Sequence, residues 1–348
     1  MGRLGCSRTT RCTARHAEGF RSARRSLLPI CAAVILAVAG APSAEAQPTD
    51  YPSRLIQVYV PFAGGSASDV ITRILLNRMA TSLGQTFVVD NRPRAGGNIG
   101  TAAAAHAAPD GYTLLMSTSG PLAANKSLFR DLGYDPLKDL APIGLFAVLP
   151  NVVVINSKLP PKSLRELIGY AKTHPKELNY GTVGVGSSQH LAGAYFEQLT
   201  GTELTHVSYR NITNYTPDFL SGQVPLGFQL LPNVIGLIRN GDARALAVAS
   251  SKRMTALPGI PTAAEAGLPD YESSAWLALL APANTNKAVI DKLYAAVVDA
   301  MNDPKVRTLF VEQGAEPLVL GPEELRNFMA SESAKWAAII RKIGIEPM

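Results

Sequence analysis

Two short clusters rich in glycine and serine contain the residues of this chain whose types and spacing best suit the binding of an anion. Loop 1 consists of Phe62, Ala63, Gly64, Gly65 and Ser66, and Asp69 lies three residues after Ser66. Loop 2 consists of Gly184, Val185, Gly186, Ser187 and Ser188. Glycine adopts backbone conformations that are closed to other residues, and serine hydroxyls cap helix starts. Each cluster therefore predicts a turn that exposes main-chain N–H groups.

The flanking segments indicate that each loop joins a strand to a helix. Ile56–Val60 has the alternating apolar pattern of a strand, and apolar residues recur at helical spacing over Val70–Met79. Leu178–Thr200 repeats this plan, and Gly201 ends its helix. A helix N-terminus offers unpaired N–H groups and the positive end of the helix dipole to a carboxylate or phosphate. One such loop could equally be a tight turn that binds nothing, but two favour a ligand held between two lobes.

Hydroxyl groups at the end of a third strand are further candidates. Ser117, Thr118 and Ser119 follow the predicted strand Tyr112–Met116. Ligands of open α/β sheets bind beyond the carboxyl ends of the strands. Capping of the next helix is an equally good interpretation of these hydroxyls.

Three residues near loop 2 each have two interpretations. His190 lies two residues after Ser188, and it either contacts a ligand or has a solvated or helix-packing role. Tyr209 and Arg210 end the predicted strand Thr205–Tyr209. The forked donors of Arg210 suit a carboxylate, although a plain surface charge remains the alternative.

The motifs of common enzymes and cofactor sites are missing from the sequence. There is no G-x-S-x-G elbow and no phosphate-binding G-x-x-x-x-G-K-[ST] motif. The run Gly184–Gln189 lacks the third glycine of a dinucleotide fingerprint. The histidines after residue 46 are not spaced as metal ligands. We therefore predict a protein that is not an enzyme and needs no metal or cofactor.

The first 46 residues have the composition of an export signal. Seven arginines precede or border the apolar run Leu27–Ala39, and Ala44–Ala46 is a small-x-small cleavage site. Without this segment, the counts fall from 33 basic and 27 acidic residues to 26 and 25. All three cysteines lie within it. We expect cleavage near Ala46 and a nearly neutral, cysteine-free periplasmic protein with no reason to bind nucleic acid.

Short apolar runs alternate with helical stretches after Gln47, which predicts an α/β fold. Leu145–Ile155, which we expect Pro150 to interrupt, and Ala275–Leu280 are candidate crossings between lobes. Each lobe is expected to be a mixed sheet flanked by helices. The predicted first lobe comprises residues 47–148 and 276–348, and the second comprises residues 149–275. Two local expectations are Asn98 as a helix cap and Thr216-Pro217 as the start of a short helix ending at Ser221.

Six sequence motifs closely resemble the solute receptors of tripartite tricarboxylate transporters, the Bug family. They extend over essentially the whole chain after Tyr51. They are PFAGGSASD (61–69), NRPRAGGNIGTAAAAHAAPDGYTLLMST (91–118), YDPLKDLAPI (134–143), NYGTVGVGSSQHLAG (179–193), SGQV (221–224) and GIPTAAEAGLPDYE (259–272).

The resemblance implies a two-lobed periplasmic binding protein of type II-like fold that closes on a small organic carboxylate. Loops 1 and 2 would hold the carboxylate through backbone groups and bridging waters, and Ser117–Ser119 and the Tyr209 region would complete the pocket. The protein would be a monomer that delivers its ligand to membrane permease subunits. This chain has Arg210-Asn211-Ile212 where relatives commonly have Lys-Gly-Gly, and Pro225 where they commonly have aspartate.

Two other function classes remain open at this stage. A receptor that presents its closed form to a membrane signalling sensor would use the same pocket. An exported hydrolase is less favoured because the nucleophile motifs are missing. We also expect Gly65→Val and Gly186→Val to abolish binding, because a β-branched side chain would block the approach of the backbone to the anion.

Overall fold

The computed structural model describes residues 51–342 and 344–348. The export signal expected over residues 1–46 therefore lies outside the described residues. Within the described part of the chain, no helix is both long enough and apolar enough to span a membrane.

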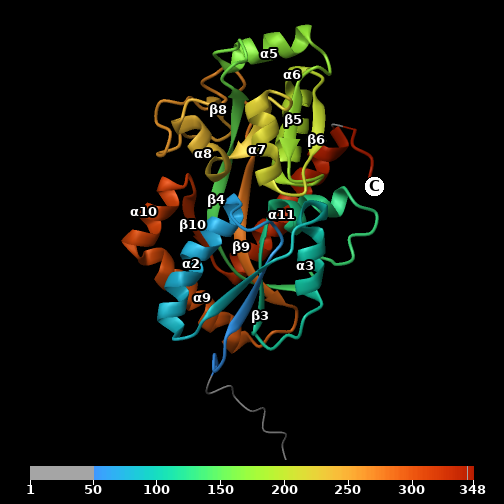
Figure 1. Ribbon diagram of the computed structural model, residues 1–348. Helices are drawn as coiled ribbons and strands as arrows, with labels where there is room; N and C mark the ends of the chain where they lie inside the picture. The colour runs from blue at the N-terminus through green and yellow to red at the C-terminus, as the bar shows by residue number, and fades with distance from the viewer. Residues whose placement is uncertain (1–50, 343) are drawn as a thin grey trace, which may run out of the picture. The chain divides into compact units, whose positions relative to one another are not determined.

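A mixed sheet forms the framework of the first lobe (Figure 1). Strands β1, β2 and β3 are parallel, and β9 joins β3 to β4 through antiparallel pairing on both sides. β10 adds an antiparallel partner to β4. The strands are β1 (Ile56–Val60), β2 (Phe87–Asn91), β3 (Thr113–Thr118), β4 (Leu140–Asn156), β9 (Ser274–Pro282) and β10 (Glu316–Leu320).

A second sheet forms the other lobe and shares β4 with the first. β4 pairs with β9 as far as Pro150, and from Asn151 onward it pairs with β7 and β8. β7 continues to β5 and β6 in parallel pairing. The remaining strands are β5 (Asn179–Thr182), β6 (Thr205–Ser208), β7 (Leu226–Leu230) and β8 (Ala243–Val248). The chain thus leaves the first sheet along β4 and returns to it along β9.

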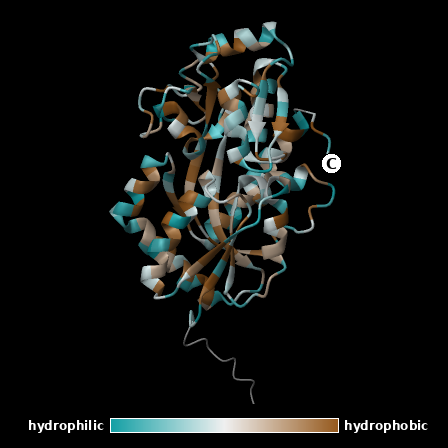
Figure 2. Cartoon of the chain, viewed as in Figure 1, coloured by the Kyte–Doolittle hydropathy of each residue, from teal (hydrophilic) through white to brown (hydrophobic). Residues whose placement is uncertain are grey.

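Helices cover both faces of both sheets, because the central strands are apolar on both sides. Along β9, Ala275, Leu277 and Leu279 pack with α2, α9 and α10, whereas Trp276 and Ala278 pack with α3, α4 and α11. This alternation is the period of two that a strand imposes on its side chains. Hydrophobic residues accordingly concentrate on the central strands (Figure 2).

In the second lobe, α5 and α6 cover one face of the sheet and α7 and α8 cover the other. The α-helices are α2 (Ala67–Leu83), α3 (Asn98–Ala105), α4 (Ser119–Leu122), α5 (Leu164–Thr173), α6 (Ser188–Thr200), α7 (Ile212–Ser221), α8 (Leu231–Arg239), α9 (Lys287–Asn302), α10 (Pro304–Glu312) and α11 (Pro322–Lys342). Two 3₁₀ turns are η1 (Ala95–Gly97) and η2 (Ala124–Ser127).

The two helices that follow the glycine loops begin and end as their sequences predict. The Ser66 hydroxyl caps α2 by accepting a hydrogen bond from Asp69 N, and the Ser187 hydroxyl caps α6 by accepting one from His190 N. Gly84 and Gly201 end these helices in left-handed conformations. Both helix starts are therefore fixed by interactions within a few residues.

Three local expectations were wrong. Pro150 does not interrupt its strand: β4 continues through it, because the proline stands where the pairing changes from one sheet to the next. α7 begins at Ile212 with Asn211 as its cap, so Pro217 lies inside the helix and does not start it. Gly97 caps α3, and Asn98 Oδ1 instead accepts a 2.5 Å hydrogen bond from the Asn125 amide.

Candidate functional site

A cleft lies between the two lobes and is lined by residues of both. The space between its walls, open solvent included, is about 530 Å³, of which the centre of a water molecule can reach about 30 Å³. The first lobe contributes loop 1 and the start of α2, and the second contributes the start of α6 and the segment after β6. The lining residues are Pro61, Phe62, Ala63, Ser66, Ala67, Ser68, Pro93, Arg94, Gly97, Thr118, Val183, Ser188, Gln189, Arg210, Asn211, Ile212, Leu230, Asn233 and Ala275. This lining contains no aspartate or glutamate.

Three main-chain N–H groups in the first turns of α2 and α6 have no hydrogen-bond partner among the described residues. They belong to Ser68 in the first turn of α2 and to Ser188 and Gln189 in the first turn of α6. A fourth N–H group, that of Ala67, donates a 3.0 Å hydrogen bond to Asn233 Oδ1 of α8 in the opposite lobe. Two helix N-termini therefore point free donors into one cleft that has no acidic lining, which is an environment suited to an anion.

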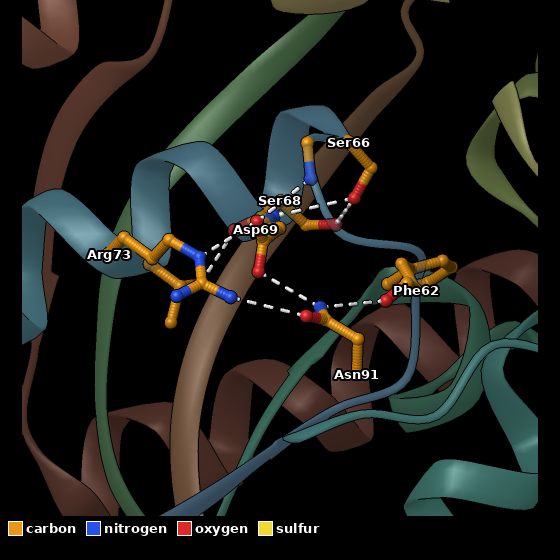
Figure 3. Close-up of polar contacts among 8 residues, drawn as sticks. Phe62, Ser66, Ser68, Asp69, Arg73 and Asn91 are labelled. Atoms are coloured by element: carbon orange, nitrogen blue, oxygen red, sulfur yellow. Dashed lines mark hydrogen bonds and ion pairs between the residues drawn. The ribbon is translucent and has the colours of Figure 1, made fainter. Parts of the chain in front are cut away.

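Loop 1 is held in place by the carboxylate of Asp69 (Figure 3). Its oxygens accept 2.9 Å hydrogen bonds from Gly65 N, from the Asn91 amide and from Arg73 Nε. The Asn91 amide also donates to Phe62 O, which ties β2 to the loop. Burial alone would raise the pKa of Asp69, but the hydrogen bonds from Arg73, Gly65 and Asn91 hold it below its usual value. Asp69 therefore remains ionised behind the loop and does not line the cleft.

Loop 2 is held by a pair of histidines, of which His190 is buried and His206 is partly buried. Gly186 N donates to His190 Nδ1 at 3.4 Å, and the His190 ring packs on the His206 ring with centroids 4.6 Å apart. His206 Nε2 is hydrogen-bonded to the Thr182 hydroxyl, which accepts from Gly184 N. Burial, with His206 adding to it, lowers the pKa of His190 to about 4. His190 is therefore neutral near pH 7 and supports the loop from behind.

Glycines bring the backbones of the two lobes into direct contact. A Cβ atom added at Gly96 or Gly120 of the first lobe would lie closer than 3.0 Å to the carbonyl oxygen of Val185 or Gly186, respectively. One added at Gly186 would overlap the Asn125 amide. At Gly65, in contrast, an added Cβ meets nothing within 4 Å, and only the positive φ of 77° opposes a side chain. No protein atom opposes a side chain at Gly65, so the expectation that Gly65→Val abolishes binding by blocking the approach to the anion stays a prediction, whereas at Gly186 a side chain also clashes with Asn125.

The strand-end hydroxyls divide among three different surroundings. Ser117 lies 3.1 Å from the Thr101 hydroxyl in the interior, and the Ser119 hydroxyl donates to Ser274 O. Thr118 lines the cleft and occupies the N-cap position of α4, yet its side chain makes no capping hydrogen bond. Only the middle hydroxyl thus reaches the space between the lobes.

Residues after β6 and in loop 2 line a second, adjoining cavity. This cavity contacts Gly184, Val185 and Tyr209, and it shares Arg94 and Arg210 with the main cleft. The Tyr209 hydroxyl donates a 2.6 Å hydrogen bond to Asp218, which turns it away from the main cleft. Gly64, Gly65, Gly186, Ser187 and His190 line neither cavity.

Sequence reasoning missed several residues of the cleft, above all Asn233, Arg94 and Gln189. Gln189 follows directly after loop 2, so its N–H group could have been recognised as part of the same helix start. Arg94 lies in the quoted motif at 91–118 but was given no role. Asn233 is 166 residues from its partner Ala67, and no local sequence pattern predicts such a contact. Among the described residues, no group of three or more metal-ligating side chains is assembled.

The comparisons with known proteins identify one family. Residues 71–345 match the family model of the tripartite tricarboxylate transporter family receptor. Protein BugT of Bordetella pertussis is 39% identical over 312 residues, which cover 89% of this chain and 95% of BugT.

Two solved structures agree with this fold. The periplasmic binding protein BugD is 34% identical with a TM-score of 0.82, covering 86% of this chain and all of BugD. Rpa4515 of R. palustris, whose structure contains adipate, is 35% identical with a TM-score of 0.83, again covering 86% of this chain and all of that protein. The predicted α/β, two-lobed binding-protein fold is thereby confirmed. The chain belongs to the receptor family of tripartite tricarboxylate transporters, a family of periplasmic solute-binding proteins.

Proposed function

We propose that this protein captures a small organic carboxylate between its two lobes and delivers it to the membrane permease subunits of a tripartite tricarboxylate-type transporter. The ligand carboxylate would accept hydrogen bonds from the main chain of loops 1 and 2 and from the first turns of α2 and α6. Thr118 is the strand-end hydroxyl placed to join them. The protein acts by binding and release, not by catalysis.

The observation that carries this proposal is the set of free N–H groups of Ser68, Ser188 and Gln189, which come from opposite lobes and meet in a cleft without acidic residues. A charge-assisted hydrogen bond to such donors contributes about 1.5–3 kcal/mol. Because both helix starts are needed for the full set, binding favours closure of the lobes. The adipate bound to Rpa4515 supports a carboxylate as the ligand class.

We also propose how the protein reaches the periplasm and where its two lobes begin and end. The first 46 residues would direct export to the periplasm and be removed near Ala46. The first lobe would comprise residues 47–148 and 276–348, and the second residues 149–275. The pairing change at Pro150 and Asn151 supports a hinge in β4 close to the first boundary. A monomer suffices, because both helix starts belong to one chain.

A thermal-shift screen of mono-, di- and tricarboxylates and aromatic acids tests the ligand class. A ligand at one hundred times its dissociation constant stabilises the fold by about 2.7 kcal/mol, which raises the melting temperature by about 5 °C or more. A shift with a carboxylate supports the proposal. Shifts with sugars or metal ions and with no carboxylate would reject it.

Removing one main-chain donor tests the mode of binding. Ser188 is the first residue of α6, and Ser187 before it is extended with ψ 157°, so a proline fits at position 188. Ser188→Pro deletes the free N–H group, and we expect it to lower carboxylate affinity about tenfold or more. Lys287→Pro makes the same change at the exposed start of α9 and should leave affinity unchanged. Equal affinity in both variants would mean that the N–H group of residue 188 does not bind the ligand.

A further inference from the structure

The side chain of Asn125 has a polar atom that is buried where the two lobes meet. Asn125 lies in η2 of the first lobe and is fully buried. Its Nδ2 atom donates a 2.5 Å hydrogen bond to Asn98 Oδ1 in the same lobe, whereas its own Oδ1 atom has no hydrogen-bond partner among the described residues. Such an oxygen is uncommon in a folded protein, because burial removes the water that it would otherwise bind.

The group that covers this oxygen belongs to the second lobe. A Cβ atom added at Gly186 would lie closer than 3.0 Å to Asn125 Oδ1, so the amide faces the Cα atom of Gly186 in loop 2. The N–H group of Gly186 donates to His190 Nδ1 and is not available to Asn125. A Cα–H group is a much weaker donor than an N–H group. Loop 2 therefore covers Asn125 Oδ1 without satisfying it.

This unfavourable contact depends on the position of the lobes. Asn98 and Asn125 both belong to the first lobe, so their hydrogen bond is the same whether the lobes are together or apart. Separation of the lobes removes Gly186 and returns Asn125 Oδ1 to water. The contact between Ala67 N and Asn233 Oδ1, in contrast, is a satisfied hydrogen bond across the lobes. Asn125 thus favours the open form, although other contacts favour the closed one.

We propose that Asn125 holds the lobes open until a ligand binds, because closure buries its Oδ1 atom against loop 2 without a donor. The inference rests on the proposed function, in which the ligand is bound by closure of the lobes. The interactions of the ligand with both helix starts offset the cost of burying this oxygen. Without a ligand nothing offsets that cost, so the cleft stays accessible.

Two substitutions at Asn125 should act in opposite directions. Asn125→Ala removes the oxygen, and it loses only a few weak contacts with Gly186, so it should favour closure. Asn125→Asp keeps the shape of the side chain but adds a charge, which is more costly to bury, so it should oppose closure. A side chain that only supports the first lobe would give the same direction of change in both variants.

Distances between two spin labels measure lobe separation. The chain has no cysteine after residue 46, so Lys172→Cys in α5 and Lys305→Cys in α10 place one label on an exposed site of each lobe. Without ligand, we expect mainly the long distance in the wild-type protein and a closed-to-open ratio about fivefold or more higher in Asn125→Ala. Adipate is the probe ligand, and Asn125→Asp should need about tenfold or more of it than wild type for the same shortening.

The matched control is Asn98→Ala, which removes the same hydrogen bond within the first lobe but leaves Asn125 Oδ1 in place. It should lower stability without raising the closed-to-open ratio. The proposal is overturned by a short distance in the ligand-free wild-type protein, by an unchanged ratio in Asn125→Ala, or by an equal rise in Asn98→Ala. If neither adipate nor any acid of the thermal-shift screen shortens the distance in any variant, the proposed function is overturned instead.

Discussion

A single methyl group at Gly120 should oppose closure of the lobes without disturbing either lobe. Gly120 lies in α4 and does not have a positive φ, so alanine is compatible with its backbone conformation. Its added Cβ would meet the carbonyl oxygen of Gly186 in the opposite lobe at less than 3.0 Å. A carbonyl oxygen of the main chain cannot turn aside as a flexible side chain can. The clash therefore exists only when the lobes are together.

The expected loss follows from the size of this overlap. Restoring an ordinary contact requires the lobes to separate by about 1 Å at this point. Overpacking of this kind costs about 1–3 kcal/mol, and because the open form escapes it, the whole penalty falls on ligand binding. We therefore expect Gly120→Ala to weaken carboxylate binding about tenfold to one hundredfold.

Calorimetry gives the affinity, and small-angle scattering with saturating ligand gives the compactness of the bound form. The variant should bind more weakly and close less fully. Gly169→Ala is the matched control, since Gly169 lies in α5 and an added Cβ meets nothing within 4 Å. It should keep wild-type affinity and gain about 1 kcal/mol of stability from the better helix former. Wild-type affinity and compactness in Gly120→Ala would refute the role of this contact in the bound state.

Three further predictions concern the groups that support the cleft. Asp69→Asn should destabilise the protein by about 2–3 kcal/mol in urea unfolding and also weaken ligand binding, because Gly65 N and the Asn91 amide lose their charged acceptor. The control, Asp242→Asn at the exposed surface, should change neither stability nor binding. Burial lowers the pKa of His190 from 6.5 to about 4, so the folded protein favours the neutral ring. The neutral ring therefore contributes about 3 kcal/mol to the free energy of unfolding above pH 6.5, and this contribution is lost as the pH falls toward 4. Urea unfolding of His190→Gln at pH 7.5 and pH 5 should show a smaller pH dependence than wild type, and an equal dependence would reject this assignment. Asn233→Asp should place a negative charge beside the N–H group of Ala67 at the start of α2. We expect calorimetry to show carboxylate affinity lowered about tenfold or more, and unchanged affinity would mean that the anion binds elsewhere.

The helix starts were predictable because short-range contacts determine them. Ser66 caps α2 through Asp69 N, and Ser187 caps α6 through His190 N, each bond spanning only three residues. A serine after a glycine turn, followed by apolar residues at helical spacing, predicts a helix start from about ten residues of sequence. The same locality explains the error at α7, where two signals compete over a short distance. The helix begins at Ile212, with Asn211 as its cap, and tolerates Pro217 inside it.

The supporting contacts of the cleft were not predictable, because they join distant parts of the chain. Asp69 was expected near a ligand, but Asn91, 22 residues away, draws its carboxylate behind loop 1. His190 likewise turns to Gly186 and to His206 of the neighbouring strand, and not to the cleft. The side chain of a titratable residue beside a glycine loop can point either into the cleft or behind the loop. Tertiary packing decides between them, and the sequence pattern is the same for both.

In this cleft, different groups determine lobe closure and ligand selectivity. The closest approaches between the lobes at Gly96 and Gly120 are to main-chain atoms, and the free donors of α2 and α6 are main-chain groups as well. Such groups recognise any carboxylate and tolerate little change, because a side chain at either glycine would meet the opposite backbone. Selectivity must then come from side chains at the edge of the cleft, where substitution does not disturb closure. Arg94 and Arg210 line that edge from opposite lobes with exposed side chains, so substitution there leaves the glycine contacts between the lobes in place.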